Sequence, residues 1–156
     1  MSASEEVLVA LQRIYPTARR VELRKSLFYA VLKSDSQRFK DDEDIEFFTK
    51  ELRECWPSII PDLWMIDVEK REITWFEVDD KHRTDNTKIE SIANLSDYLM
   101  NYLWAINLVI YRLDPIPTRY YAGWRELQTR DRFKVCKSQM IEYLNIGADG
   151  KCSRTA

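Results

Sequence analysis

The chain has 156 residues, of which 45% are hydrophobic and 12% aromatic, enough for one domain with a buried core and unlike a disordered or fibrous chain. The net charge is −2, but residues 41–80 carry fourteen acidic side chains against four basic ones, whereas residues 1–40 and 115–156 each carry eight basic against four acidic. An acidic middle between basic ends fits either a solvated acidic face or a divalent-metal site bordered by phosphate-binding surface.

The N-terminal third is predicted to be helical. Apolar residues recur at helical spacing over Ser4–Ile14, and Pro16 ends that helix. Val21–Lys33 repeats the helical spacing, with a first β-strand as the alternative. A third helix is expected over Asp44–Trp56, with the aspartate as its N-cap and one apolar face buried.

Two short β-strands follow, at Leu63–Val68 and Ile73–Val78. Both runs are rich in β-branched and aromatic residues, and the polar residues between them predict a hairpin turn. Thr87–Leu103 is the next predicted helix, opened by a capping-box pattern. Ala105–Leu113 is apolar on both faces, as expected of a strand inside a sheet.

The remainder is predicted to hold helices at Tyr121–Arg130 and Lys137–Leu144. In order, the helices, hairpin, helix and strand predict one mixed α/β domain that spans the whole chain. Its expected parts are an N-terminal helical part (4–33), a central core (44–114), a basic helical C-terminal extension (115–146) and a tail (147–156).

Strand parity gathers three carboxylates at one end of the hairpin. If the turn is centred between Lys70 and Arg71, Asp62 stands across from Asp79, and Glu77 shares their face because side chains alternate along a strand. Directly opposed Cβ atoms lie about 4.5–5.5 Å apart, and a register shift of two keeps the same face. We therefore predict a carboxylate cluster, with acidic strand ends of no function as the alternative.

Three carboxylates beside apolar residues repel one another unless a cation compensates. Oxygen ligands at this density suit Mg²⁺ or Mn²⁺, which bind a few carboxylates and keep water molecules for chemistry. A bound metal can activate water and stabilise charge on a phosphoryl oxygen. Asp62, Glu77 and Asp79 are the predicted metal ligands, and Lys81 is placed to orient the water or to offset charge on the phosphate.

The pattern Pro61-Asp62 followed by Glu77-Val78-Asp79-Asp80-Lys81 resembles the motif of the PD-(D/E)XK nuclease superfamily. The predicted order of elements over residues 44–114 also resembles its restriction endonuclease-like fold. The resemblance implies a Mg²⁺-dependent DNA endonuclease that uses these carboxylates and the lysine as catalytic residues. In several members of that superfamily a glutamate of the preceding helix joins the metal, which implies Glu51 or Glu54 here.

The sequence departs from the family motif at its lysine. With Glu77 as the acidic residue, the lysine position holds Asp79. With Asp79 as the acidic residue, Lys81 completes the motif, and Lys88 is a further substitute. The departure also admits a catalytically inactive relative that binds DNA or serves in assembly.

Basic residues on both sides of the motif are candidates for contact with DNA. They are Lys81, His82, Arg83 and Lys88 near the carboxylates, and Arg119 and Arg125 among the C-terminal aromatic residues. For the C-terminal residues, helices that cover a core with their long side chains are the alternative. A domain this small needs more surface to hold a duplex, so we expect a homodimer.

The cysteines and the start of the chain indicate the compartment. Three widely spaced cysteines and one histidine argue against a Cys/His zinc site. The N-terminus lacks a signal-peptide pattern, and the longest apolar run is far shorter than the roughly 20 residues of a membrane helix. We expect a cytoplasmic protein with reduced cysteines and no membrane contact.

Overall fold

The computed structural model describes residues 3–79, 86–112, 133–136, 144–146 and 152–154. Its elements, in chain order, are α1 (Ala3–Ile14), α2 (Leu23–Ser34), α3 (Asp42–Cys55), β1 (Leu63–Asp67), β2 (Glu72–Asp79), α4 (Asn86–Leu99), the 3₁₀ turn η1 (Met100–Tyr102), β3 (Ala105–Arg112), β4 (Phe133–Cys136), β5 (Leu144–Ile146) and β6 (Cys152–Arg154). The expected mixture of helices and strands is therefore confirmed.

The central sheet has the strand order β1-β2-β3-β4. β1 and β2 form an antiparallel hairpin, whereas β3 runs parallel to β2 and β4 runs parallel to β3. A parallel pair needs a crossover connection, and α4 lies in the one that joins β2 to β3. β5 and β6 pair with each other in a separate two-stranded sheet.

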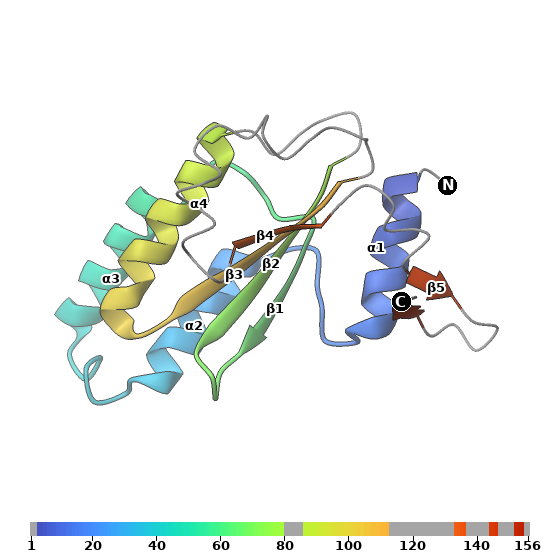
Figure 1. Ribbon diagram of the computed structural model, residues 1–156. Coiled ribbons are helices and arrows are strands. Elements are labelled where there is room, and N and C mark those ends of the chain that lie inside the picture. The colour runs from blue at the N-terminus through green and yellow to red at the C-terminus, as the bar shows by residue number, and fades with distance from the viewer. Residues whose placement is uncertain (1–2, 80–85, 113–132, 137–143, 147–151, 155–156) are drawn as a thin grey trace.

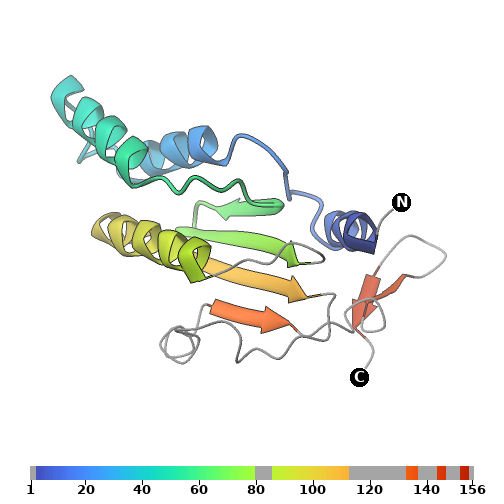
Figure 2. The same cartoon turned by 90° about the horizontal axis from the view of Figure 1, so that it is seen from above.

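Helices cover both faces of the sheet. Figures 1 and 2 show α2, α3 and α4 on one face and α1 on the other. Trp64, Ile73 and Trp75 point into the larger core with the three helices, and Leu63 and Phe76 point into the smaller core with α1. This division follows from the alternation of side chains along a strand, so the predicted face assignment of the hairpin is confirmed.

The predicted helices of the N-terminal third are confirmed, including the helix over residues 21–33 for which a strand was the alternative. One boundary differs, because α3 begins at Asp42 and Asp41 stands at its N-cap position. The predicted cap Asp44 lies within the first turn. Several acidic residues in a row all suit the positive end of a helix, so this run did not define a unique start.

The hairpin turn lies one residue earlier than predicted. Asp67 pairs with Glu72, so the turn comprises residues 68–71 instead of 69–72. The Asp67 carboxylate accepts a hydrogen bond from the Lys70 amide at 3.1 Å, and Arg71 closes the turn with a φ of 54°. The β-branched Val68 has strand propensity, but Asp67 before it favours a turn, and Val68 therefore lies in the turn and not in the strand.

β1 is an edge strand of the sheet although the hairpin strands are largely apolar on both faces. Both faces of β1 carry core residues because α1 and α2 lie on opposite sides of it. The segment between these helices covers part of the open edge. Arg19 and Trp64 exchange two backbone hydrogen bonds of 2.9 and 2.8 Å, and the Trp64 indole donates to the Val21 carbonyl at 3.1 Å.

The prediction of a helical C-terminal extension is wrong for those of its residues that the structure describes. Residues 133–136 form β4 beside β3, and residues 144–146 form β5, which begins at the end of the predicted helix Lys137–Leu144. Strands of three or four residues lack enough length to reveal a period, and pairing with a neighbour decides them. The predicted helix Tyr121–Arg130 lies outside the described residues.

Candidate metal centre

Asp62, Glu77 and Asp79 lie at one end of the hairpin. Asp62 directly precedes β1, Asp79 is the last residue of β2, and Glu77 stands two positions before it. The pairs Leu63–Phe76 and Trp64–Trp75 set the register, which continues as a hydrogen bond of 3.1 Å from the Asp62 amide to the Phe76 carbonyl. Asp62 therefore lies across from Glu77, not from Asp79 as predicted.

The carboxyl groups of Asp62 and Glu77 lie close enough together for Asp62 to raise the pKa of Glu77. Two ionised carboxylates this close repel each other, which favours either a proton on Glu77 or a cation beside the pair. Two protein donors complete the arrangement. The Trp75 indole donates to Oε1 of Glu77 at 2.8 Å, and the Val78 amide donates to Oδ2 of Asp62 at 2.7 Å.

Glu77 is 9% exposed, and this burial is the main reason why its pKa rises from 4.5 to about 8. The Trp75 hydrogen bond opposes the rise because it stabilises the charged form. The negative charges of Asp62 and, more weakly, Asp79 reinforce it. Without a cation, Glu77 thus holds a proton at neutral pH, and a cation beside the pair would displace that proton.

Asp79 is 3% exposed and stands opposite Arg112 of β3 in the parallel ladder. It affects the charge of Glu77, but within the described ranges no three Asp, Glu, His or Cys side chains group closely enough to hold a metal ion. The predicted cluster of three is therefore a pair of carboxyl groups, Asp62 and Glu77, with the third carboxylate nearby. Such a pair fits Mg²⁺, which proteins commonly hold by one or two carboxylates together with water and substrate phosphate.

Arg20 is a charged neighbour of this pair that the sequence analysis missed. Its guanidinium makes hydrogen bonds of 3.2 and 2.8 Å to the two carboxylate oxygens of Glu5. This contact raises the pKa of Arg20, and the charge of Asp62 adds to the rise. The Arg19-Arg20 doublet in a basic N-terminal block was the available signal, but only the backbone bridge to Trp64 places it beside the motif.

The two glutamates implied on the preceding helix have different surroundings. The carboxylate of Glu51 accepts a hydrogen bond of 2.9 Å from the hydroxyl of Tyr98 on α4. Glu54 is exposed on the last turns of α3. Among the described residues neither forms a metal-binding group of three with Asp62 and Glu77, so Glu54 as a metal ligand stays a prediction.

Most of the predicted basic residues lie outside the described part of the chain. Lys88 is half-buried in the first turn of α4, the helix that follows β2. The others, Lys81, His82, Arg83, Arg119 and Arg125, are not among the described residues, so their roles stay predictions.

Comparison with known proteins leaves the function to be argued from the residues. The chain matches no protein-family model, no curated protein and no solved structure. As for membranes, the described helices include none that is both long and apolar enough to span one.

Proposed function

We propose that the protein is a metal-dependent endonuclease that hydrolyses phosphodiester bonds in DNA. The observation that carries the proposal is the placement of the half-buried Asp62 beside the buried Glu77, because a proton or a cation relieves the repulsion between two such like charges. The order α3–β1–β2–α4–β3 supports it, since this order resembles the restriction endonuclease-like core. Mg²⁺ is the proposed cofactor, with Mn²⁺ as a substitute.

In this proposal Asp62 and Glu77 would hold the cation, and Asp79 would add negative charge nearby. The cation would supply activated water and stabilise charge on the phosphate. On binding a cation Glu77 would release its proton to water, and Trp75 would keep the ionised carboxylate in place. Lys81, two residues beyond Asp79, is the proposed partner of the attacking water or of the phosphate.

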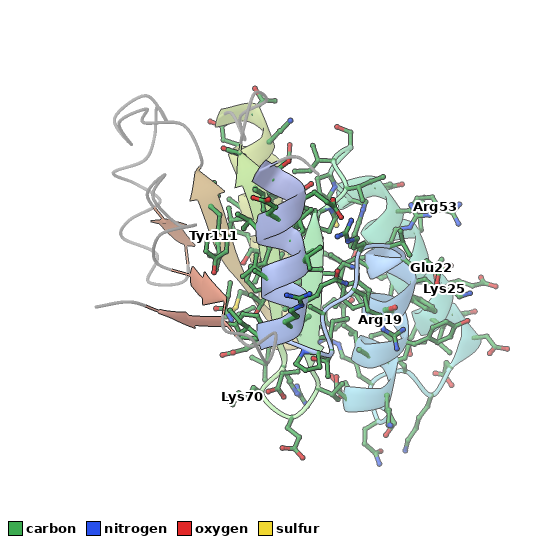
Figure 3. All side chains as sticks on the ribbon, turned by 90° about the vertical axis from the view of Figure 1, so that its right-hand side faces the viewer. Arg19, Glu22, Lys25, Arg53, Lys70 and Tyr111 are labelled. Carbon is green, nitrogen blue, oxygen red and sulfur yellow. The ribbon has the colours of Figure 1, made fainter. Side chains whose placement is uncertain are left out.

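The proposed DNA contact includes the connection between α1 and α2 and the first turn of α2. Arg20 is near Asp62, and the exposed Arg19, Arg24 and Lys25 flank it. Figure 3 shows Arg19, Lys25 and Glu22, the acidic exception, on the side of α2 and α3. Basic side chains in such a band are suited to phosphates of the DNA backbone. A homodimer is proposed because a single small domain offers little surface for a duplex.

The second candidate function is a nuclease-fold protein that binds DNA or serves in assembly without cleaving. It is favoured by Asp79, which occupies the lysine position of the motif if Glu77 is the acidic residue. Asp79 is an acidic residue and almost fully buried, so its side chain neither supplies the positive charge of the lysine nor is accessible to a substrate phosphate. Both functions share the carboxylate pair and differ in whether a bound phosphodiester is hydrolysed.

Incubation with supercoiled plasmid distinguishes the two functions. The endonuclease proposal expects nicking or linearisation with Mg²⁺ or Mn²⁺ and none with EDTA. Asp62→Asn and Glu77→Gln should each abolish cleavage, whereas Glu69→Gln removes the same charge from the exposed turn of the same hairpin and should leave it intact. Absence of metal-dependent cleavage of duplex, single-stranded and branched DNA would contradict the proposal. So would undiminished cleavage by Asp62→Asn.

A further inference from the structure

Trp75 combines complete burial with a hydrogen bond to a charged site. Its side chain is 0% exposed in the core beneath α2, α3 and α4, and the ring of Trp56 lies 6.4 Å away between centroids. Its indole N–H donates to Oε1 of Glu77 at 2.8 Å. The indole N–H can only donate a hydrogen bond, so Glu77 is always the acceptor in this contact and Trp75 cannot itself bind a cation. Packing on the ring therefore sets where the glutamate oxygen is held.

Asp62 is held in the same manner by a donor that the backbone supplies. The Val78 amide donates to its Oδ2 at 2.7 Å, and the β-ladder on either side of Val78 fixes the direction of that amide. One oxygen of each carboxyl group is thus occupied by a neutral protein donor. Oδ1 of Asp62 and Oε2 of Glu77 are the oxygens left to share a proton or a cation.

The two donors also address a physical difficulty of the pair. Terminal torsions of carboxylate side chains are broad, so two like charges at a strand end would tend to rotate apart. Hydrogen bonds from surrounding groups are the usual means by which proteins orient metal-binding side chains. A donor on the non-binding oxygen holds each carboxylate without neutralising the oxygen that binds.

We infer that Trp75 is a positioning residue of the metal centre, whose indole N–H turns Glu77 so that it and Asp62 present one oxygen each to a single small divalent cation. The inference rests on the proposed metal binding and adds a specific requirement for the N–H group. If Trp75 only filled the core, its shape would matter and its N–H would not. This difference can be tested directly.

The test replaces Trp75 by benzothienylalanine, which keeps the shape of tryptophan and has sulfur in place of N–H. Trp104 offers a matched control, since it is also 0% exposed and its indole donates to a side-chain oxygen, that of Ser34, at 3.0 Å. Calorimetric titration with Mn²⁺ should show affinity lower by about tenfold or more for the replacement at 75. The same replacement at 104 should leave the affinity unchanged.

A spectroscopic measurement on the unmodified protein gives a second readout. Addition of Mg²⁺ should shift the indole ¹H–¹⁵N signal of Trp75 in proportion to occupancy, because the carboxyl group of Glu77 that accepts its hydrogen bond would then bind the cation. The signal of Trp104 should stay in place. Glu77→Gln should remove the shift at Trp75. The signal of Trp75 is assigned by its loss in Trp75→Phe.

The outcomes separate the inference from the proposal beneath it. Unchanged Mn²⁺ affinity with benzothienylalanine at position 75, or a Trp75 signal that does not respond to Mg²⁺, would overturn the positioning role while the metal centre stands. A native protein that binds neither ion would overturn both. Metal binding that depends on the Trp75 N–H without any DNA cleavage would support the positioning role of Trp75 and overturn the proposed endonuclease function.

Discussion

At neutral pH, Glu77 can remain buried beside Asp62 either by holding a proton or by sharing a cation. Burial and the neighbouring negative charges raise its pKa to about 8, and Trp75 limits the rise. The same features that disfavour its ionised form in the free protein make it a group that a cation can ionise. Stability and metal affinity should therefore both depend on pH through this one side chain.

We predict that Glu77 makes the metal-free protein less stable as the pH rises. The folded pKa of about 8 exceeds the ordinary value of 4.5, so the folded state binds more protons than the unfolded state between these values. The contribution of Glu77 to stability is thus complete below pH 4.5 and is lost as the pH rises to 8, by up to about 1.4 kcal/mol per pH unit. Urea unfolding in EDTA at pH 5.5, 6.5, 7.5 and 8.5 measures it.

Two variants isolate this contribution from the other carboxylates. The stability of Glu77→Gln relative to the native protein should increase with pH across this range, because glutamine does not titrate. Glu69→Gln, on the exposed turn, should follow the native profile. Saturating Mg²⁺ should flatten the dependence of the native protein, since a cation binds the ionised form. Parallel profiles of the native protein and Glu77→Gln in EDTA would count against a raised pKa.

At the level of elements, the position of one turn decides which carboxylates meet. The sequence predicts the hairpin and the shared face of Asp62, Glu77 and Asp79, because a shift of two residues preserves parity. It does not predict the partner of Asp62, because Val68 suits a strand as well as the turn. The hydrogen bonds of Asp67 and Arg71 place the turn at residues 68–71, and the resulting register sets Asp62 across from Glu77.

Arg71 is expected to stabilise the turn through contacts that lie far away in the sequence. Its guanidinium donates to the carbonyl of Ser34 at 2.9 Å and, more weakly, to that of Tyr102 at 3.4 Å. Arg71→Met should lower the free energy of unfolding by about 1–3 kcal/mol because these carbonyls lose a charged donor. Lys70→Met, at an exposed site of the same turn, should change it by less than about 0.5 kcal/mol. Equal effects in chemical unfolding would refute this role.

The connection between α1 and α2 is expected to contact DNA. Backbone bonds between Arg19 and Trp64 fix this connection beside β1, which places Arg20 near Asp62. Arg20→Met should weaken DNA binding and reduce the slope of log affinity against log salt by about 0.9 for one lost phosphate contact. Arg13→Met removes an exposed charge from α1 and serves as the control. Fluorescence anisotropy with duplex DNA in Ca²⁺ measures both, and equal salt slopes for the two variants would exclude a specific contact.

For the whole molecule, the predicted order of elements is confirmed from α1 to β3. These segments could be predicted because each is long enough to show its own hydrophobic period in the sequence. The short strand β4 escaped prediction because its pairing with β3 depends on residues distant in the sequence. Arg20 escaped for the same reason. Sequence patterns thus identified the carboxylates, while the tertiary arrangement determined that Asp62 and Glu77 form the pair and that Trp75 and Arg20 adjoin it.

Calorimetric titration of Mn²⁺ into the full chain at pH 7.5 tests the central claim most directly. The account predicts one saturable site, absent from Asp62→Asn and from Glu77→Gln and retained by Glu69→Gln, with release of protons on binding. Affinity should increase as the pH approaches 8, because less of Glu77 then holds a proton. Absence of binding to the native protein, or equal binding by Glu77→Gln, would contradict a metal centre at this pair.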